Sequence, residues 1–176
     1  MKYKKPSTIV LIAITVIFIH TTLVSDTRHG TWVIYNVPAS PQSEKTIPVK
    51  IYFPKSYSDT SRVIIAFHEY DGSMNSWQDN TSIAYYANQY NMVIVCPHMP
   101  RSVYESYYFE QTTVKWNEMP SLLWIGQLLL PYLNNTVGLN ITKENLGVCG
   151  FSIGARGALR VGEMYNDAVG AIACLS

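Results

Sequence analysis

The sequence is poor in the residues that cross-link small secreted folds or hold metal ions. It contains three cysteines, an odd number that gives no disulfide framework, and each lies at or near the end of an apolar run. We therefore expect Cys96, Cys149 and Cys174 to be small buried hydrophobic residues. The histidines form no ligand-spaced pair with each other or with a cysteine, so no metal site and no cofactor is predicted. These histidines are His20, His29, His68 and His98.

An excess of charge of one sign is also lacking. The 176 residues carry 13 Lys plus Arg against 12 Asp plus Glu, which gives no reason to expect nucleic acid or an acidic surface as a partner. There are no internal repeats and no low-complexity linker. The length suits one domain with a real core, and the 13 tyrosines and 4 tryptophans indicate a packed globular domain.

The N-terminus has the layout of a secretory signal. A basic start at Lys2, Lys4 and Lys5 precedes an apolar run over residues 9–19, which is too short to span a bilayer comfortably. No A-x-A cleavage pattern follows, and Ser25 is the best small residue, so an uncleaved anchor stays open. We expect residues 1–25 to be a signal peptide or membrane anchor, with attachment through residues 9–24, and the protein to be exported to the periplasm or the extracellular space, or membrane-anchored.

The pattern of apolar runs predicts an α/β fold with a mostly parallel sheet and flanking helices over residues 31–176. Residues 31–37 and 47–53 suit an antiparallel edge hairpin, whereas the continuous apolar runs 63–67 and 92–96 suit central parallel strands covered on both faces. A strand at residues 146–151 and a buried strand at residues 168–175 follow. Alternation of strand and helix then implies right-handed crossovers.

Three helices are expected between these strands. The first covers residues 81–90 with Asp79 or Asn80 as its cap, and the second covers residues 119–133, where Pro131 is expected to kink or end it. The third begins directly after the fifth strand, over residues 153–165. The longest irregular stretch, residues 97–115, carries several aromatic side chains that either border a substrate cleft or cover the core. They are Tyr104, Tyr107, Tyr108 and Phe109.

The stretch that organises the chain is Gly-Phe-Ser-Ile-Gly at residues 150–154. It fits G-x-S-x-G, the strand-to-helix turn that holds a serine oxygen at the end of a sheet. Glycine is required at Gly150 and Gly154 because side chains there would collide with the strand or the helix. The helix N-terminus points free amides at Ser152, which suits an oxyanion. The alternative is a glycine-rich turn of another α/β fold with Ser152 as a helix N-cap.

In these motifs the sequence resembles the α/β-hydrolases, and within them the esterase group of S-formylglutathione hydrolases, feruloyl esterases and mycolyltransferases. The segment GFSIGARGAL at residues 150–159 is similar to the group's G-x-S-M-G-G-x-G-A-L. The segment FHEYDGS at residues 67–73, followed by Trp77, resembles the group's H-G-x-G-G-S loop. The segment LLPYL at residues 129–133 resembles the group's helix that precedes the strand leading into the G-x-S-x-G turn, called the nucleophile elbow.

The resemblance implies roles for particular residues. Ser152 would be the nucleophile, and the backbone N–H groups of Ile153 and Tyr70 would form the oxyanion hole. His68 would structure the loop rather than act as the base, because the family's base comes from late in the chain. The chain departs from the family where Glu69 and Asp71 replace glycines.

The catalytic acid and histidine of this family have no counterpart after Ser152. Only Glu163 and Asp167 follow as carboxylates, and no histidine follows at all. We therefore expect the N-terminal part of an α/β-hydrolase, incomplete at its C-terminal end. Two hypotheses stay open: a carboxylic-ester hydrolase that acts on a small-molecule or acyl ester with residues beyond 176, and an exported, non-catalytic remnant or binding module.

Overall fold

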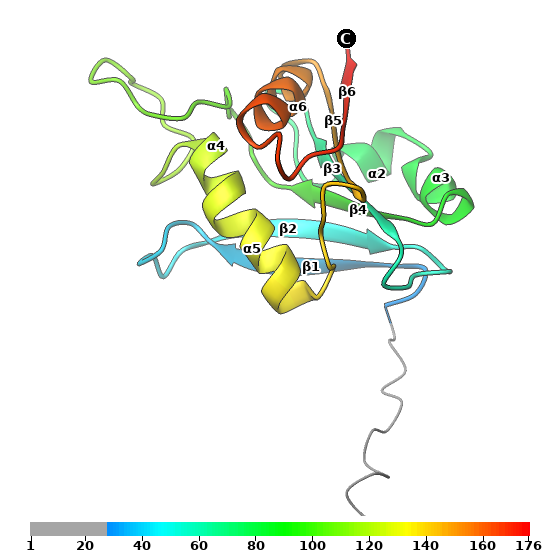
Figure 1. Ribbon diagram of the computed structural model, residues 1–176. Helices are drawn as coiled ribbons and strands as arrows, with labels where there is room; N and C mark the ends of the chain where they lie inside the picture. The colour runs from blue at the N-terminus through cyan, green and yellow to red at the C-terminus, as the bar shows by residue number, and fades with distance from the viewer. Residues whose placement is uncertain (1–27) are drawn as a thin grey trace, which may run out of the picture.

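The computed structural model describes residues 28–176 (Figure 1). The predicted signal or anchor at residues 1–25 lies outside them, so it stays a prediction. Across residues 28–176, no helix is long and apolar enough to cross a bilayer.

Six strands form one mixed sheet in the order β1-β2-β4-β3-β5-β6. β1 pairs antiparallel with β2, and β2 pairs antiparallel with β4, whereas β4, β3, β5 and β6 run parallel to one another. The predicted edge hairpin, the central parallel strands and the mostly parallel sheet are confirmed. The strands are β1 Thr31–Pro38, β2 Thr46–Phe53, β3 Arg62–Phe67, β4 Met92–Pro97, β5 Leu146–Phe151 and β6 Ala171–Leu175.

The last strand differs from its prediction in both length and burial. β6 starts at Ala171 instead of residue 168, because the N–H groups of Ala168 and Val169 donate to the Tyr165 carbonyl. All five residues of β6 are exposed, because among residues 28–176 the strand pairs with β5 alone. The prediction of a buried strand was therefore wrong.

The first predicted helix is two short helices instead of one. α2 covers Ser76–Asn80 and α3 covers Ile83–Gln89, with Ser82 at the N-cap position of α3. Asp79 and Asn80, predicted as the cap, lie within α2, so that prediction was wrong. The two helices are separate because Thr81 is in an extended conformation.

The second predicted helix is longer than expected and continues past its proline. It consists of α4 Ser121–Trp124, the π-helical turn η1 Ile125–Leu129, α5 Leu130–Tyr132 and the π-helical turn η2 Leu133–Val137. Pro131 lies in α5, between the two wide turns, and does not end the helix. A proline nitrogen has no hydrogen to donate, and widened turns are one way in which a helix accommodates an interruption of its hydrogen bonds. Gly138, at φ 79°, closes the helix.

The two faces of the sheet are covered unequally. The larger core lies between the sheet and the helices α4 to η2 and α6 Ile153–Met164, and it includes Ile65, Val95 and Val148. The alternate residues of the strands, such as Ile64 and Ile94, face a smaller cluster under α2 and α3. Figure 1 shows α2 and α3 together near β4, away from the long helix.

The three cysteines differ in burial, and all are free thiols. Cys96 is buried in β4 and Cys149 is half-buried in β5, as expected of small hydrophobic residues. Cys174 is exposed, so its predicted burial was wrong, and the reason is its place on the edge strand β6.

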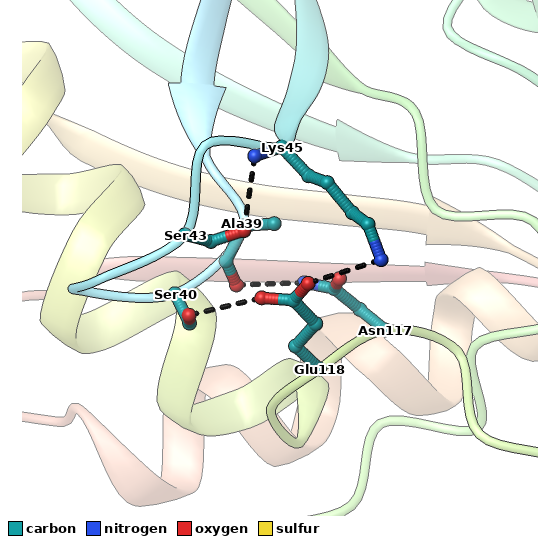
Figure 2. A network of polar contacts seen from close by, with 6 residues as sticks. All are labelled: Ala39, Ser40, Ser43, Lys45, Asn117 and Glu118. Atoms are coloured by element: carbon teal, nitrogen blue, oxygen red, sulfur yellow. Dashed lines mark hydrogen bonds and ion pairs between the residues drawn. The ribbon is translucent and has the colours of Figure 1, made fainter.

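The end of the long irregular segment is fastened to the β1–β2 turn by a polar network (Figure 2). The Glu118 carboxylate accepts a hydrogen bond from the Ser40 hydroxyl at 3.0 Å and lies 3.3 Å from the Lys45 ammonium. The Asn117 side-chain amide donates to the Ala39 carbonyl at 2.8 Å. These contacts fix where the segment enters α4.

The aromatic residues of the irregular segment divide between the two predicted roles. Tyr104 is buried and covers the core, with its ring 5.2 Å from that of Phe67. The hydroxyl of the half-buried Tyr108 donates to the carbonyls of Asn117 and Met119, whereas Tyr107 and Phe109 are exposed.

Candidate active site

The turn between β5 and α6 has the backbone geometry expected of a nucleophile elbow. Ser152 has φ 56° and ψ −120°, a strained combination for a residue with a side chain. A Cβ atom on Gly150 would overlap the Gly154 carbonyl and would lie 2.8 Å from the Ala155 nitrogen. Both neighbours are backbone atoms, which cannot move aside. Glycine is therefore required at position 150 by close contact.

The second glycine of the motif brings the elbow against the end of β3. A Cβ atom on Gly154 would overlap the Phe67 carbonyl oxygen and lie 2.7 Å from the His68 carbonyl oxygen. The first turn of α6 thus packs directly on the backbone that enters the loop after β3. This contact places residues 68–73, called here the His68 loop, beside Ser152.

Ser152 occupies the N-cap position of α6 but does not cap the helix with its side chain. No hydrogen bond joins its hydroxyl to the first turn, and its backbone N–H donates to the Leu175 carbonyl at 3.0 Å. The hydrogen bond expected from a serine that serves as an N-cap is therefore missing. The side chain is exposed at the end of the sheet.

Two backbone amides, one directly after this serine and one in the His68 loop, have no acceptor among residues 28–176. Ile153 is the first residue of α6, and its N–H makes no hydrogen bond within this range. The Tyr70 N–H in the His68 loop is unpaired in the same way, although the Tyr70 carbonyl accepts from the Arg101 N–H at 2.6 Å. Free amides at the start of a helix of 12 residues can stabilise a negative oxygen atom.

His68 is 2% exposed, and the backbone uses both of its ring nitrogens. Nδ1 lies 2.6 Å from the Glu69 carbonyl oxygen, and Nε2 accepts a hydrogen bond from the Met99 N–H at 2.9 Å. An acceptor at Nε2 places the proton of the neutral ring on Nδ1. Burial is the main cause that lowers the pKa of His68, and the Glu69 carbonyl and carboxylate oppose it. The neutral ring structures the loop, as the sequence suggested.

Glu69, which stands where the esterases that this sequence resembles have glycine, is held inside the loop. Its carboxylate accepts a hydrogen bond from the Ser76 hydroxyl at 3.1 Å, and a Cβ atom on Gly72 would lie 2.6 Å from the Glu69 carboxyl carbon. The second replacement, Asp71, lies at the surface, 3.4 Å from the Arg101 guanidinium. The loop accommodates both departures because Gly72 leaves space for the first and solvent surrounds the second.

A pocket of about 290 Å³ opens beside the elbow, on the α2 side of the sheet. Phe151 and Glu69, the neighbours of Ser152 and Tyr70, contribute to its wall, but Ser152 itself does not. The lining is mainly apolar. It consists of Glu69, Ser76, Trp77, Asn80, Thr81, Phe151 and Leu175.

The carboxylates that follow Ser152 do not point to an acid–base partner. Glu163 is exposed near the end of α6, and Asp167 is exposed in the turn after it. No hydrogen bond joins either carboxylate to a histidine within the part of the chain that the structure describes. The structure therefore places Ser152 and Ile153 at the start of α6, whose first turn packs on the backbone that enters the His68 loop, and it places Glu163 and Asp167 near and beyond the other end of α6.

Sequence reasoning placed residues 97–115 at a substrate cleft or over the core, but it did not predict that part of this segment connects the two halves of this site. Residues 99–104 contact the His68 loop through Met99 and Arg101, and they contact α6 through Val103 and Tyr104. The only available signal was the position of this segment directly after the carboxyl end of β4.

Comparison with known proteins places this geometry in a known fold. No protein-family model and no curated protein matches the sequence. Among solved structures, a substrate-bound fluorophosphonate-binding serine hydrolase F of Staphylococcus aureus is 17% identical, with a TM-score of 0.64 over 79% of this chain and 54% of that chain. An S-formylglutathione hydrolase from Agrobacterium tumefaciens is 14% identical, with a TM-score of 0.63 over 78% and 55%.

A third match is a ferulic acid esterase from Anaeromyces mucronatus in complex with ferulic acid, 20% identical, with a TM-score of 0.57 over 80% of this chain and 56% of that chain. The chain has the α/β-hydrolase fold of these esterase-type structures. It spans about half the length of the solved structures that it matches.

Proposed function

We propose that this protein is a serine hydrolase of the carboxylic-ester type, with Ser152 as its nucleophile. The observation that carries the proposal is the strained Ser152 at the end of β5, with the unpaired amide of Ile153 directly after it and the unpaired amide of Tyr70 in the loop that α6 packs against. The esterase-type solved structures support this class of reaction, and they share the fold.

In the proposed reaction, the Ser152 oxygen attacks the carbonyl carbon of a small-molecule or acyl ester. The negative charge moves to the carbonyl oxygen, where the Ile153 and Tyr70 amides stabilise it. One such donor typically contributes a factor of about 10²–10³ in rate. The alcohol leaves, and water then releases the acid from the acyl-enzyme.

The base and the acid are proposed to come from residues beyond 176. In this fold they follow the serine in the order acid, then histidine. The pocket beside the elbow suits an apolar part of the ester, because Trp77, Phe151 and Leu175 line it.

The experiment is hydrolysis of short-chain p-nitrophenyl esters by the protein isolated from its native source. We expect Ser152→Ala to lower the rate by at least about 1,000-fold, as removal of a triad serine does. Ser58→Ala, in the loop between β2 and β3, is the matched control and should retain the wild-type rate.

A second candidate is a non-catalytic exported binding module with a hydrolase fold, because neither Glu163 nor Asp167 is bonded to a histidine within residues 28–176. Equal hydrolysis by the wild type and Ser152→Ala would favour it. Export or anchoring through residues 9–24 is also proposed, and N-terminal sequencing of the membrane and secreted fractions tests it. A start at Met1 in a soluble cytosolic fraction would contradict export.

A further inference from the structure

Two residues other than glycine adopt left-handed backbone conformations directly after β4. Arg101 has φ 61° and Tyr104 has φ 55°. Such conformations cost free energy in residues with side chains, and they persist where surrounding contacts enforce them. We call residues 99–104 the clamp segment and consider which contacts enforce its shape.

On one side the clamp segment holds the His68 loop by two backbone donors. The Met99 N–H donates to His68 Nε2 at 2.9 Å, in a fully buried hydrogen bond. The Arg101 N–H donates to the Tyr70 carbonyl at 2.6 Å. The Tyr70 carbonyl belongs to the peptide unit that follows Tyr70, so this bond restricts the residue whose own N–H has no acceptor among residues 28–176.

On the other side the clamp segment holds the elbow helix. The Arg156 guanidinium donates to the Val103 carbonyl, and the Tyr104 ring packs on Gly157, where an added Cβ atom would lie 2.6 Å from ring atoms. The Tyr104 ring also meets Phe67, the last residue of β3, edge to face. The two strained residues therefore lie between the two parts of the site.

We propose that the clamp segment is the positioning element that keeps the Tyr70 and Ile153 amides aligned as one oxyanion hole. We propose also that the neutral His68 ring is the buried link between the clamp segment and the His68 loop. This inference rests on the proposed function, since it assigns the two amides to one oxyanion hole. His68 acts through Tyr70, so it is a positioning residue.

Protonation of His68 breaks the link. With a proton on each ring nitrogen, Nε2 becomes a donor that faces the Met99 N–H, and the hydrogen bond is lost. Two titratable groups act on the ring: the Glu69 carboxylate in the same loop, and His98, which directly follows β4. The ring centroids of His68 and His98 are 6.3 Å apart. From α6 the contact is Gly154, which has no side chain.

The test compares two variants of the full-length protein. His68→Leu removes the acceptor for the Met99 N–H, whereas His68→Gln offers an amide oxygen that accepts the same hydrogen bond and does not titrate. The first readout is the rate of Ser152 phosphonylation by a fluorophosphonate between pH 5 and 8. We expect His68→Leu to be about 100-fold slower, the usual effect of losing one oxyanion donor, and His68→Gln to stay near the wild-type rate.

The dependence of the labelling rate on pH distinguishes a positioning role of His68 from a role in folding alone. The wild-type rate should fall at acid pH more steeply than that of His68→Gln, because only the wild-type link can be protonated. Coincident profiles for the wild type and His68→Gln, or an unimpaired His68→Leu, would overturn the proposal.

The second readout does not depend on the chemistry of Ser152. In nuclear magnetic resonance spectra, we expect the His68 ring with its proton on Nδ1 at pH 7. In His68→Leu, the Met99 amide should exchange with solvent at least about tenfold faster, and the Tyr70 and Ile153 amide signals should shift together.

The two readouts distinguish the two failures. If the wild type is not labelled but the amide changes occur, the proposed function fails and the clamp stands. If labelling occurs but Met99, Tyr70 and Ile153 are unchanged in His68→Leu, the clamp fails. Should His68→Leu not fold, the wild-type titration compared with His68→Gln decides.

Discussion

The elbow and the His68 loop lie side by side, yet different forces hold them in place. The elbow is fixed by exclusion: at Gly150 and Gly154, backbone atoms occupy the space that a side chain would need. The His68 loop is fixed by hydrogen bonds, chiefly those to Met99 and Arg101. A perturbation of the elbow should therefore be severe and independent of pH, whereas a perturbation of the loop should be graded and pH-dependent.

The largest effect is expected at the elbow. Gly150→Ala places a Cβ atom against the Gly154 carbonyl, which cannot move aside, so we expect a cost of about 3 kcal/mol, the upper end of the usual range for overpacking. We expect an equivalent loss in the free energy of unfolding, measured by urea denaturation, together with loss of Ser152 labelling.

The matched control for the elbow is Gly138→Ala at the end of η2. Unlike Gly150, Gly138 has a positive φ, 79°, and an added Cβ atom there meets nothing within 4 Å. Only the backbone conformation is penalised there, at about 1–2 kcal/mol. Equal losses for the two variants would contradict steric exclusion as the force that fixes the elbow.

A smaller, pH-dependent effect is expected in the His68 loop. The pKa of His68 is lower in the folded protein than in the unfolded chain, so the unfolded chain binds more protons between the two values. The stabilisation from the neutral ring is therefore complete above the ordinary histidine pKa of about 6.5 and is lost as the pH falls through the lowered value.

The measurement is the free energy of unfolding against pH for the wild type and His68→Gln. The difference between them should shrink or reverse below pH 6, because only the wild type carries the titrating ring. At pH 7, His68→Leu should cost about 1–3 kcal/mol, since it leaves the buried Met99 N–H without an acceptor. Parallel curves would contradict the role given to His68.

The smallest effect separates the backbone of the clamp segment from its surface charge. Arg101→Ala removes an exposed ion pair with Asp71 and keeps the N–H that bonds to Tyr70, so it should cost no more than about 1 kcal/mol. Arg101→Gly also loses the ion pair but suits φ 61° and should be more stable than Arg101→Ala by about 1 kcal/mol. Thermal unfolding of the pair measures this, and the reverse order would mean that position 101 is not strained.

The same contrast between local and long-range contacts explains which features could be predicted from the sequence and which could not. The elbow was predictable because its requirements are local: Gly150, Ser152 and Gly154 lie within five residues, after an apolar strand. The central strands were predictable because their burial on both faces leaves continuous apolar runs. No local pattern indicates that Met99 bonds to His68, 31 residues earlier, or that Arg156 bonds to Val103, 53 residues earlier.

The errors in the predicted elements also have physical causes. Asp79 and Asn80 are good capping residues, but Thr81 is extended and places them at the end of α2 instead of the start of α3. The apolar sequence around Cys174 suggested burial, whereas the edge position of β6 leaves it exposed. Burial of an apolar strand depends on its neighbours, which composition does not specify.

The central claim is that Ser152 is an activated nucleophile. It is tested most directly by the intact mass of the protein from its native source, before and after treatment with a fluorophosphonate. A single adduct that maps to Ser152 and is absent from Ser152→Ala is the predicted result. An unchanged mass in the wild type would contradict the claim and would favour a hydrolase fold without catalytic function.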